Sequence, residues 1–269
     1  MSSDSAPAAA AGAWDAEYAA GRYAGEPPVT FTRDILAAAR ETGLTRGLYI
    51  GCGNGRNYLP LVAGGLDLTG LDISAAAISQ LGTRAPDRRD RLVHGDLAAL
   101  PAAASYPVVI GIQVFQHGDR ATAHAHIRAA QRRVAPGGLF CLRVNATATD
   151  VWPGHEVTEH HPDGGFTVRY DAGPKQGLLI HFFTAAELDA LFADGFTPVL
   201  PPRLWQSRRD PPQPGQWSQW EAIWRKAERT FPVSVKGVAV QGGKVLLLEN
   251  ERGEWELPRR KHDRAGGQR

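Results

Sequence analysis

The sequence predicts an α/β protein built on a doubly wound, Rossmann-like parallel sheet. From residue 30 to residue 146, short apolar runs alternate strictly with stretches of helical periodicity, as in a sheet that carries helices on both faces. The apolar runs are nearly continuous, which is typical of parallel strands buried on both sides. A glycine-rich turn follows the first run, at the edge of the sheet where this architecture binds ligands.

The strands and helices of the first half follow from apolar patterning and from helix start and stop signals. Short apolar runs predict strands at 47–52, 67–74, 90–96, 106–115 and 139–146. Helical spacing predicts helices at 30–42, 57–64, 75–85 and 120–134. Gly43 ends the first helix, Ser74 is placed to cap the third, and the Pro-Gly-Gly run from Pro136 stops the last.

The second half begins with an irregular segment. Residues 149–177 are rich in His, Gly and Pro and are too long for an ordinary connection, so we expect a functional loop or a small insertion there. A strand over 178–183 follows. Thr184 and Glu187 then form a T-x-x-E pattern, which predicts a capping box at the start of a helix over 185–195.

Two further strands are predicted at 196–205 and 217–225. In the second, Trp220, Ala222 and Trp224 alternate with mostly polar residues, which favours antiparallel pairing with two differently filled faces. The fold class is therefore a doubly wound α/β sheet with an antiparallel last strand, followed by a short C-terminal β-hairpin.

The composition of the two ends divides the chain into three parts. Residues 1–13 are small, polar and of low complexity, so we expect a disordered lead-in. The main domain is expected over 14–229. A separate segment over 230–269 contains a hairpin pattern around Gly242 and Gly243 and ends in a basic tail.

Charge, cysteine content and hydropathy exclude several classes of protein. The formal charge of +2, from 30 basic and 28 acidic residues, gives no basic field for nucleic acid. Two cysteines suggest no disulfide framework, and no run approaches the roughly 20 apolar residues of a membrane span. We therefore expect a cytoplasmic protein that binds neither nucleic acid nor membrane.

The glycine turn has the spacing G-x-G-x-G, formed by Gly51, Gly53 and Gly55. Glycines between a strand and a helix let the backbone approach a ligand closely, and the helix start offers free N–H groups. A dinucleotide fingerprint would place its third glycine at Arg56, and the Gly-Lys-Ser/Thr end of a phosphate loop is missing. The turn alone therefore indicates a nucleotide or an anion.

Two acids follow at the ends of the next two strands. Asp72 lies 21 residues after Gly51, where a carboxylate can accept both hydroxyls of a ribose. Asp96, in the sequence His94-Gly95-Asp96-Leu97, is expected near an adenine edge. The alternative is that the glycines only make a tight turn and that the acids cap helices.

Taken in order, these motifs resemble the class I S-adenosylmethionine-dependent methyltransferases over residues 14–226. The resemblance rests on LYIGCGNGRN, LDIS, HGDL, VVIGIQVFQH and RRVAPGGLF. It implies a doubly wound, Rossmann-like sheet of seven strands whose last strand is antiparallel. It also implies S-adenosyl-L-methionine as cofactor, with Gln113 near the methyl group. It also implies cofactor contacts at Gly51, Cys52, Gly53, Gly55, Asp72, Ile73, Asp96 and Leu97.

The N-terminal WDAEYAAGRYAGEPP resembles the cover segment of the tellurite-, thiopurine- and halide-methylating branch. That resemblance implies that Trp14, Tyr18 and Tyr23 close over the cofactor; the alternative is that these aromatics pack on the first helix. One position departs from the family. Tyr49 stands where the family usually has an acid for the amino group of the cofactor.

Methyl transfer from a sulfonium is an in-line displacement, and a base is needed only for acceptors that lose a proton. His117 is the first candidate for such a base and His181 the second, although packing is the alternative for both. A cluster of histidines and glutamates in the long loop lacks the H-E-x-x-H spacing, so no metal site is predicted. Its members are His155, Glu156, Glu159, His160 and His161. His124 and His126 are expected on the solvent side of their helix.

The C-terminal stretch FPVSVKGVAVQGGKVLLLENERGEWELP resembles the opening strands of a Nudix hydrolase. No glutamate follows Glu256, so the metal-binding Nudix box is missing and pyrophosphohydrolase activity is not expected. The hairpin offers an edge through which a homodimer can form.

The leading hypothesis is methyl transfer to a small-molecule acceptor. The alternatives are an incomplete Nudix-type hydrolase fusion and a non-catalytic cofactor-binding protein.

Overall fold

The computed structural model describes residues 5–173, 175–209 and 214–228, together with six two-residue strands between Val235 and Arg260. The chain divides into two compact units, Met1–Glu228 and Arg229–Arg269. No helix in these described residues is long and apolar enough to cross a membrane.

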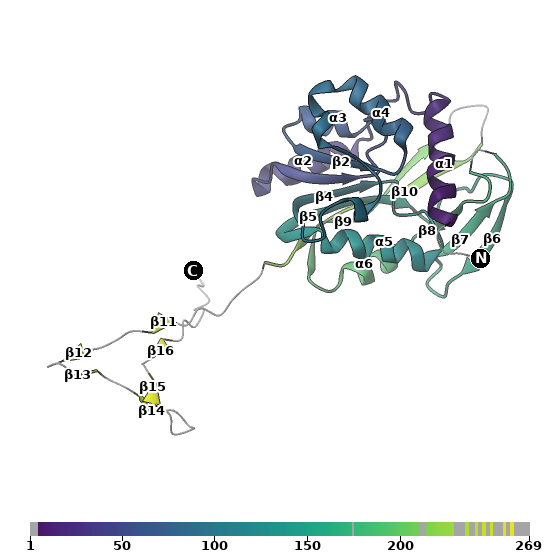
Figure 1. Ribbon diagram of the computed structural model, residues 1–269. Coiled ribbons are helices and arrows are strands. Elements are labelled where there is room, and N and C mark those ends of the chain that lie inside the picture. The colour runs from purple at the N-terminus through teal and green to yellow at the C-terminus, as the bar shows by residue number, and fades with distance from the viewer. Residues whose placement is uncertain are drawn as a thin grey trace. The chain divides into compact units, whose positions relative to one another are not determined.

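A seven-stranded sheet forms the centre of the first unit, in the order β3-β2-β1-β4-β5-β10-β9 (Figure 1). The first five strands of the unit are parallel, whereas β10 runs antiparallel to both β5 and β9. The strands are β1 Arg46–Ile50, β2 Asp67–Asp72, β3 Leu92–His94, β4 Tyr106–Ile112, β5 Val134–Asn145, β9 Phe196–Arg208 and β10 Gln216–Lys226. The predicted α/β class and the antiparallel last strand are confirmed.

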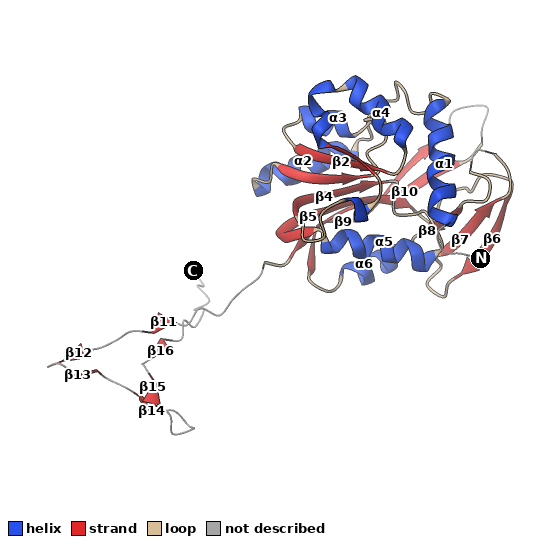
Figure 2. Cartoon of the chain, viewed as in Figure 1, coloured by secondary structure: helices blue, strands red, loops and turns tan. Residues whose placement is uncertain are grey.

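Helices cover both faces of this sheet (Figure 2). The helices are α2 Phe31–Thr42, α3 Tyr58–Ala63, α4 Ala75–Arg84, α5 Arg120–Arg132 and α6 Ala185–Phe192, with short 3₁₀ turns at Pro86–Arg91 and Leu97–Ala99. One apolar core joins α2, α3 and α4 to the sheet, and a second joins α5 and α6 to its other face. In the second core Phe192 stacks on Trp224 with ring centroids 3.8 Å apart.

Three capping signals of the sequence act as predicted, whereas the predicted stop signal at residues 136–138 lies within β5, after α5 has ended at Arg132. Gly43 ends α2 in a left-handed conformation with φ 69°. The Ser74 side chain accepts a hydrogen bond from the Ala77 N–H at the start of α4. Thr184 and Glu187 make both hydrogen bonds of a capping box at the start of α6.

The irregular segment is a small insertion with its own sheet. Strands β6 His155–His160 and β7 Phe166–Tyr170 pair antiparallel, and β7 pairs with β8 Leu179–Phe182. The strand predicted over 178–183 therefore belongs to this three-stranded sheet. Its own core is formed by Val168, Tyr170, Ile180 and Phe182.

The N-terminal lead-in differs from the prediction. Residues 5–13, expected to be disordered, are part of helix α1 Ser5–Ala19. An alanine-rich stretch has high helix propensity, and the C-terminal half of α1 is anchored to α4. Asp15 Oδ1 accepts hydrogen bonds from Ser74 Oγ at 2.6 Å and from the Ala76 N–H at 3.0 Å. Figure 1 shows α1 beside α4.

The second unit contains β11 Val235–Lys236, β12 Val240–Gln241, β13 Lys244–Val245, β14 Leu248–Glu249, β15 Trp255–Glu256 and β16 Arg259–Arg260. Strands β12 and β13 pair antiparallel on either side of the predicted Gly242-Gly243 turn. The turn itself, the basic tail and most of the stretch that resembles a Nudix hydrolase lie outside the described residues.

Candidate functional site

The glycine turn after β1 has a backbone that only glycine adopts easily. Gly51, Gly53 and Gly55 have φ angles of 71°, 55° and 97°. There is also no room for side chains. A Cβ on Gly51 would lie 2.8 Å from Val114, and one on Gly53 would lie 2.5 Å from the Tyr18 hydroxyl. The three glycines are therefore required by conformation and by space.

The Asp72 carboxylate, at the end of β2, holds this turn in place. Its Oδ2 accepts a hydrogen bond from the Gly53 N–H at 2.7 Å, and its Oδ1 accepts one from the Ser74 N–H at 2.9 Å. Asp72 is only 7% exposed, and burial raises its pKa while the two hydrogen bonds oppose the rise. Each carboxylate oxygen keeps a further lone pair that can accept a ligand hydroxyl.

The acid at the next strand end behaves differently. Asp96 is exposed, and its Oδ1 accepts a hydrogen bond from the Ala98 N–H at 2.8 Å, so it caps the short turn that begins with Leu97. The two acids lie at adjacent strand ends, because Asp72 pairs in register with His94. His94 Nε2 lies 3.1 Å from the carbonyl oxygen of Ile73, which links the two loops.

Gln113 follows β4 with a positive φ of 58°, which is unusual for a residue with a side chain. Its N–H donates to the Arg143 carbonyl of β5 at 2.7 Å, which holds the chain in this conformation. Such strain is typical of functional positions. The next residue, Val114, faces Gly51, so the end of β4 and the glycine turn lie against each other.

Aromatic side chains from the N-terminal segment cover the turn. The Tyr18 hydroxyl lies over Gly53, and burial, together with the nearby Asp72 charge, raises the pKa of Tyr18. Trp14 packs edge-on against His117 with ring centroids 5.2 Å apart. Tyr23 has a φ of 64° and packs against Tyr18 at 5.8 Å. All three predicted lid residues thus gather near the turn.

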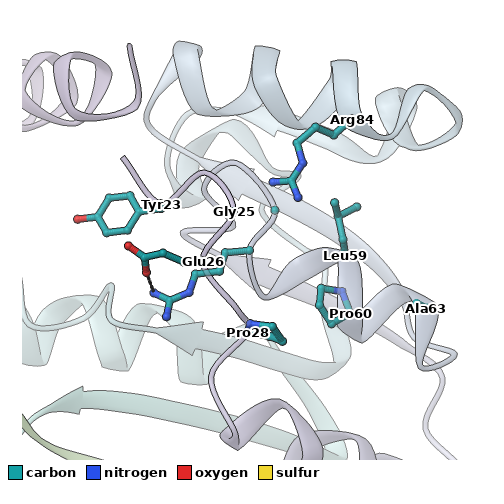
Figure 3. A pocket seen from close by; sticks show the side chains of 10 residues that line it. Tyr23, Gly25, Glu26, Pro28, Leu59, Pro60, Ala63 and Arg84 are labelled. Carbon is teal, nitrogen blue, oxygen red and sulfur yellow. Dashed lines mark ion pairs between the residues drawn. The ribbon is translucent and has the colours of Figure 1, made fainter. Parts of the chain in front are cut away.

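A cavity of about 360 Å³ has Gly55 among its lining residues (Figure 3). Tyr23, Arg56 and Arg84 are among its lining residues, and Arg56 pairs with Glu26 at 2.8 Å. Neither Asp72 nor Gln113 lines this cavity. The space directly above Gly53 is instead occupied by Tyr18 of α1.

His117 is half-buried beside this site. Its Nε2 lies 3.3 Å from the Gln113 carbonyl oxygen. Burial and, secondarily, the charge of Lys175 lower the pKa of His117 to about 3. The imidazole is therefore neutral at neutral pH and is a weak base.

His181 lies in a different environment. It is fully buried, with Nδ1 at 3.0 Å from Thr167 Oγ1 and Nε2 at 2.9 Å from Glu187 Oε1. The structure does not bring it to the glycine turn.

His124 was expected on the solvent side, but it is half-buried, because its Nε2 lies 2.5 Å from the same Glu187 oxygen. His126 is exposed, as predicted.

Tyr49 lies in the same apolar core as Cys52 and Tyr58. It is 1% exposed and packs against Tyr58 with ring centroids 6.4 Å apart. Burial raises the pKa of its hydroxyl, and a hydrogen bond with Asn57 opposes the rise. Cys52, the remaining predicted residue of the turn, is buried as a free thiol.

The anchors of α1 were missed from the sequence. Asp15 binds the start of α4, and Gln80 Nε2 of α4 donates to the Tyr18 carbonyl oxygen at 2.8 Å. The available signal was the spacing of Trp14 and Tyr18 by one helical turn, with an acid beside the first.

Comparison with protein families supplies the decisive observation. Residues 48–138, which run from β1 to the start of β5 and include the glycine turn, match the family model described as "Methyltransferase domain". This segment is similar to methyltransferase domains. A comparison of the sequence with curated proteins gave no match.

Solved structures share the fold of this chain. One is the 1,6-didemethyltoxoflavin-N1-methyltransferase of Burkholderia thailandensis, with bound 1,6-didemethyltoxoflavin and S-adenosylhomocysteine. It is 18% identical, with a TM-score of 0.55 over 83% of this chain and 92% of that chain. Another is the magnesium protoporphyrin IX methyltransferase of Synechocystis PCC 6803, with bound SAM. It is 15% identical, with a TM-score of 0.55 over 82% of this chain and 97% of that chain.

A third solved structure is described as converting a disulfide bond into a thioacetal group during echinomycin biosynthesis. It is 20% identical, with a TM-score of 0.51 over 76% of this chain and 83% of that chain. At these identities the similarities establish a shared fold.

Proposed function

We propose that this chain transfers the methyl group of S-adenosyl-L-methionine to a small-molecule acceptor by in-line displacement. The observation that carries the proposal is the glycine turn within the methyltransferase domain, fixed by the hydrogen bond from the Gly53 N–H to Asp72. The Burkholderia and Synechocystis enzymes, which share the fold, were solved with S-adenosylhomocysteine and with SAM.

The residues of the turn fit such a cofactor. Gly51, Gly53 and Gly55 let the backbone of the turn pass closely against its neighbours, and Asp72 keeps free lone pairs beside it. In this assignment the turn, with Cys52, surrounds the methionine part. Asp72 and Ile73 hold the ribose, Asp96 and Leu97 flank the adenine, and Gln113 lies near the methyl group. When bound, S-adenosyl-L-methionine supplies a methyl group on a positively charged sulfur.

Helix α1 acts as a lid in this proposal. Because the Tyr18 hydroxyl lies over Gly53, a ligand can occupy the turn only if Tyr18 and α1 move. After binding, Trp14, Tyr18 and Tyr23 exclude water from the reacting groups, which an in-line displacement requires. This lid also supports the finer assignment to the tellurite-, thiopurine- and halide-methylating branch.

His117 limits the kind of acceptor. A neutral imidazole with a pKa of about 3 accepts a hydrogen bond but removes a proton poorly. We therefore assign His117 to holding the acceptor, and we favour soft sulfur, selenium, tellurium or halide acceptors, which react without a strong base. His181 is not assigned as the base, because both of its ring nitrogens face Thr167 and Glu187 in a buried network.

The test is methyl transfer from S-adenosyl-L-methionine with a labelled methyl group to a panel of thiols, phenols, amines, halides and metalloid anions. Labelled product and stoichiometric S-adenosylhomocysteine are expected with at least one soft acceptor. Cofactor binding without turnover across the whole panel would contradict the enzymatic proposal. It would favour a non-catalytic cofactor-binding protein, to which the replacement of the usual acid by the buried Tyr49 points.

A further inference from the structure

Five metal-ligating side chains gather on the inserted sheet, away from the glycine turn. They form two groups that share His181 of β8. The inner group adds His124 of α5 and Glu187 of α6, whereas the outer group adds Glu159 of β6 and His161, which follows that strand. Within each group the ligand atoms lie within 4.8 Å of one another.

The inner group is held together by hydrogen bonds and an ion pair to Glu187. His124 Nε2, His181 Nε2 and Arg120 Nε lie 2.5 Å, 2.9 Å and 3.0 Å from a single oxygen, Glu187 Oε1. Burial opposes ionisation, yet the hydrogen bonds from the two histidines lower the pKa of Glu187 to about 2. This oxygen is a carboxylate surrounded by donors, so the inner group leaves no room for a metal ion.

The same hydrogen bond fixes the tautomer of His181. Its Nε2–H donates to the Glu187 carboxylate, so a neutral ring carries its lone pair on Nδ1. The Nδ1 atom faces Thr167 Oγ1 at 3.0 Å, but that hydroxyl donates its single proton to Glu159 Oε2 at 2.6 Å. While Thr167 donates to Glu159 it gives no proton to Nδ1, which leaves the Nδ1 lone pair available as a metal ligand.

Of the other two members, His161 has an unpartnered donor atom, whereas Glu159 Oε2 already accepts hydrogen bonds from Thr167 Oγ1 and, at 3.1 Å, from the Arg120 N–H. His161 Nε2 is shielded from solvent and has no hydrogen-bond partner in the described part of the chain. It lies 3.4 Å from Glu159 Oε2. Tetrahedral zinc with bonds of about 2.0–2.1 Å requires a separation between ligand atoms of about 3.4 Å. The Glu159–His161 pair already has this spacing.

We propose that Glu159, His161 and His181 bind a divalent transition-metal ion of the zinc type. Two imidazoles and one carboxylate are a common zinc ligand set that leaves a fourth position open. Glu187 supplies the carboxylate that orients a ligating histidine through its second nitrogen.

The proposed ion can enter from solvent, because the side chains of Glu159 and His161 are 32% and 20% exposed. The carboxylates of Glu159, Asp163 and Glu187 outnumber the one nearby guanidinium, that of Arg120, which pairs with the last two. The ion would tie β6 to β8 and, through Glu187, to α6. The site is independent of the proposed methyl transfer.

The test uses the untagged full chain, freed of metal with a chelator and titrated with Zn²⁺ by calorimetry and with Co²⁺ by visible absorption. One ion per chain is expected. The Co²⁺ form should show the intense visible absorption bands that are typical of cobalt with a low coordination number. The variants His161→Ala and Glu159→Gln should weaken binding at least tenfold. The matched control is His160→Ala, which removes the adjacent exposed histidine and should bind like the unaltered chain.

Two outcomes would overturn the proposal. One is that the unaltered chain takes up no stoichiometric zinc. The other is that both ligand variants bind zinc as tightly as the His160→Ala control.

Discussion

Gly53 carries two separate constraints at the level of single residues. Its φ of 55° disfavours any side chain, and a Cβ there would lie 2.5 Å from the Tyr18 hydroxyl. Gly43 has a similar φ of 69° but nothing within 4 Å of its Cβ position. A comparison of substitutions at the two positions therefore distinguishes the cost of backbone strain from the cost of the collision with Tyr18 of α1.

We predict that Gly53→Ala lowers the free energy of unfolding by more than Gly43→Ala, which should cost about 1–2 kcal/mol from strain alone. Tyr18→Phe removes the colliding hydroxyl and should recover part of the difference in the double variant. Urea unfolding of the single and double variants measures this coupling. Equal losses for both glycine variants, with no recovery, would show that Tyr18 does not lie on the turn.

His117 makes stability depend on pH. Because its pKa falls from 6.5 to about 3 on folding, the unfolded chain binds more protons between these values. Stability should therefore fall as the pH drops below 6.5, by roughly 2 kcal/mol at pH 5. Urea unfolding at pH 7 and pH 5 should show a smaller difference for His117→Asn than for the unaltered chain. His160→Asn, at an exposed position, is the control. The same change in the free energy of unfolding between pH 7 and pH 5 in all three proteins would exclude this role of His117.

At the level of elements, the sequence identified helices whose signals are local. Ser74, Thr184 and Glu187 cap the helices they were expected to cap, because a cap depends on residues three positions apart. Helix α1 was missed over residues 5–13, because its alanine-rich composition reads equally as low complexity. The hydrogen bonds of Asp15 to the start of α4 come from residues 59 and 61 positions away, which no local pattern reports.

The docking of α1 depends on Asp15 in this account. Asp15→Ala removes the acceptor for Ser74 Oγ and the Ala76 N–H, at a cost of about 1 kcal/mol for a partly exposed group. Hydrogen exchange of the backbone over residues 10–19 should accelerate about fivefold. Glu17→Ala removes an acid on the same helix that pairs only with the exposed Arg22, and it should leave exchange unchanged. Equal exchange in both variants would contradict the anchoring role.

At the level of the whole molecule, alternating elements and glycine spacing were sufficient to predict the sheet and the location of the turn. Parallel strands bring Gly51, Asp72 and Gln113 to one edge, so their proximity follows from topology alone. The outer metal-ligand group could not be predicted from the sequence. Glu159 and His161 were noted in the sequence, but His181 joins them only through the pairing of β6, β7 and β8.

The separate environments of the two catalytic candidates also required the structure. His117 and His181 both follow or occupy short apolar strands, and the sequence ranks them only by distance from the turn. Their difference arises from partners elsewhere in the chain, Trp14 in one case and Glu187 in the other.

The central claim, that the glycine turn and Asp72 bind S-adenosyl-L-methionine, is tested most directly by calorimetric titration with S-adenosylhomocysteine. We predict one site per chain and an affinity at least tenfold weaker in Asp72→Asn, a loss of about 1.4 kcal/mol. The control is Asp67→Asn, which alters an acid at the opposite end of β2 that pairs with Arg88, and it should bind normally. Absence of binding by the unaltered chain, or equal affinity in the two variants, would contradict the claim.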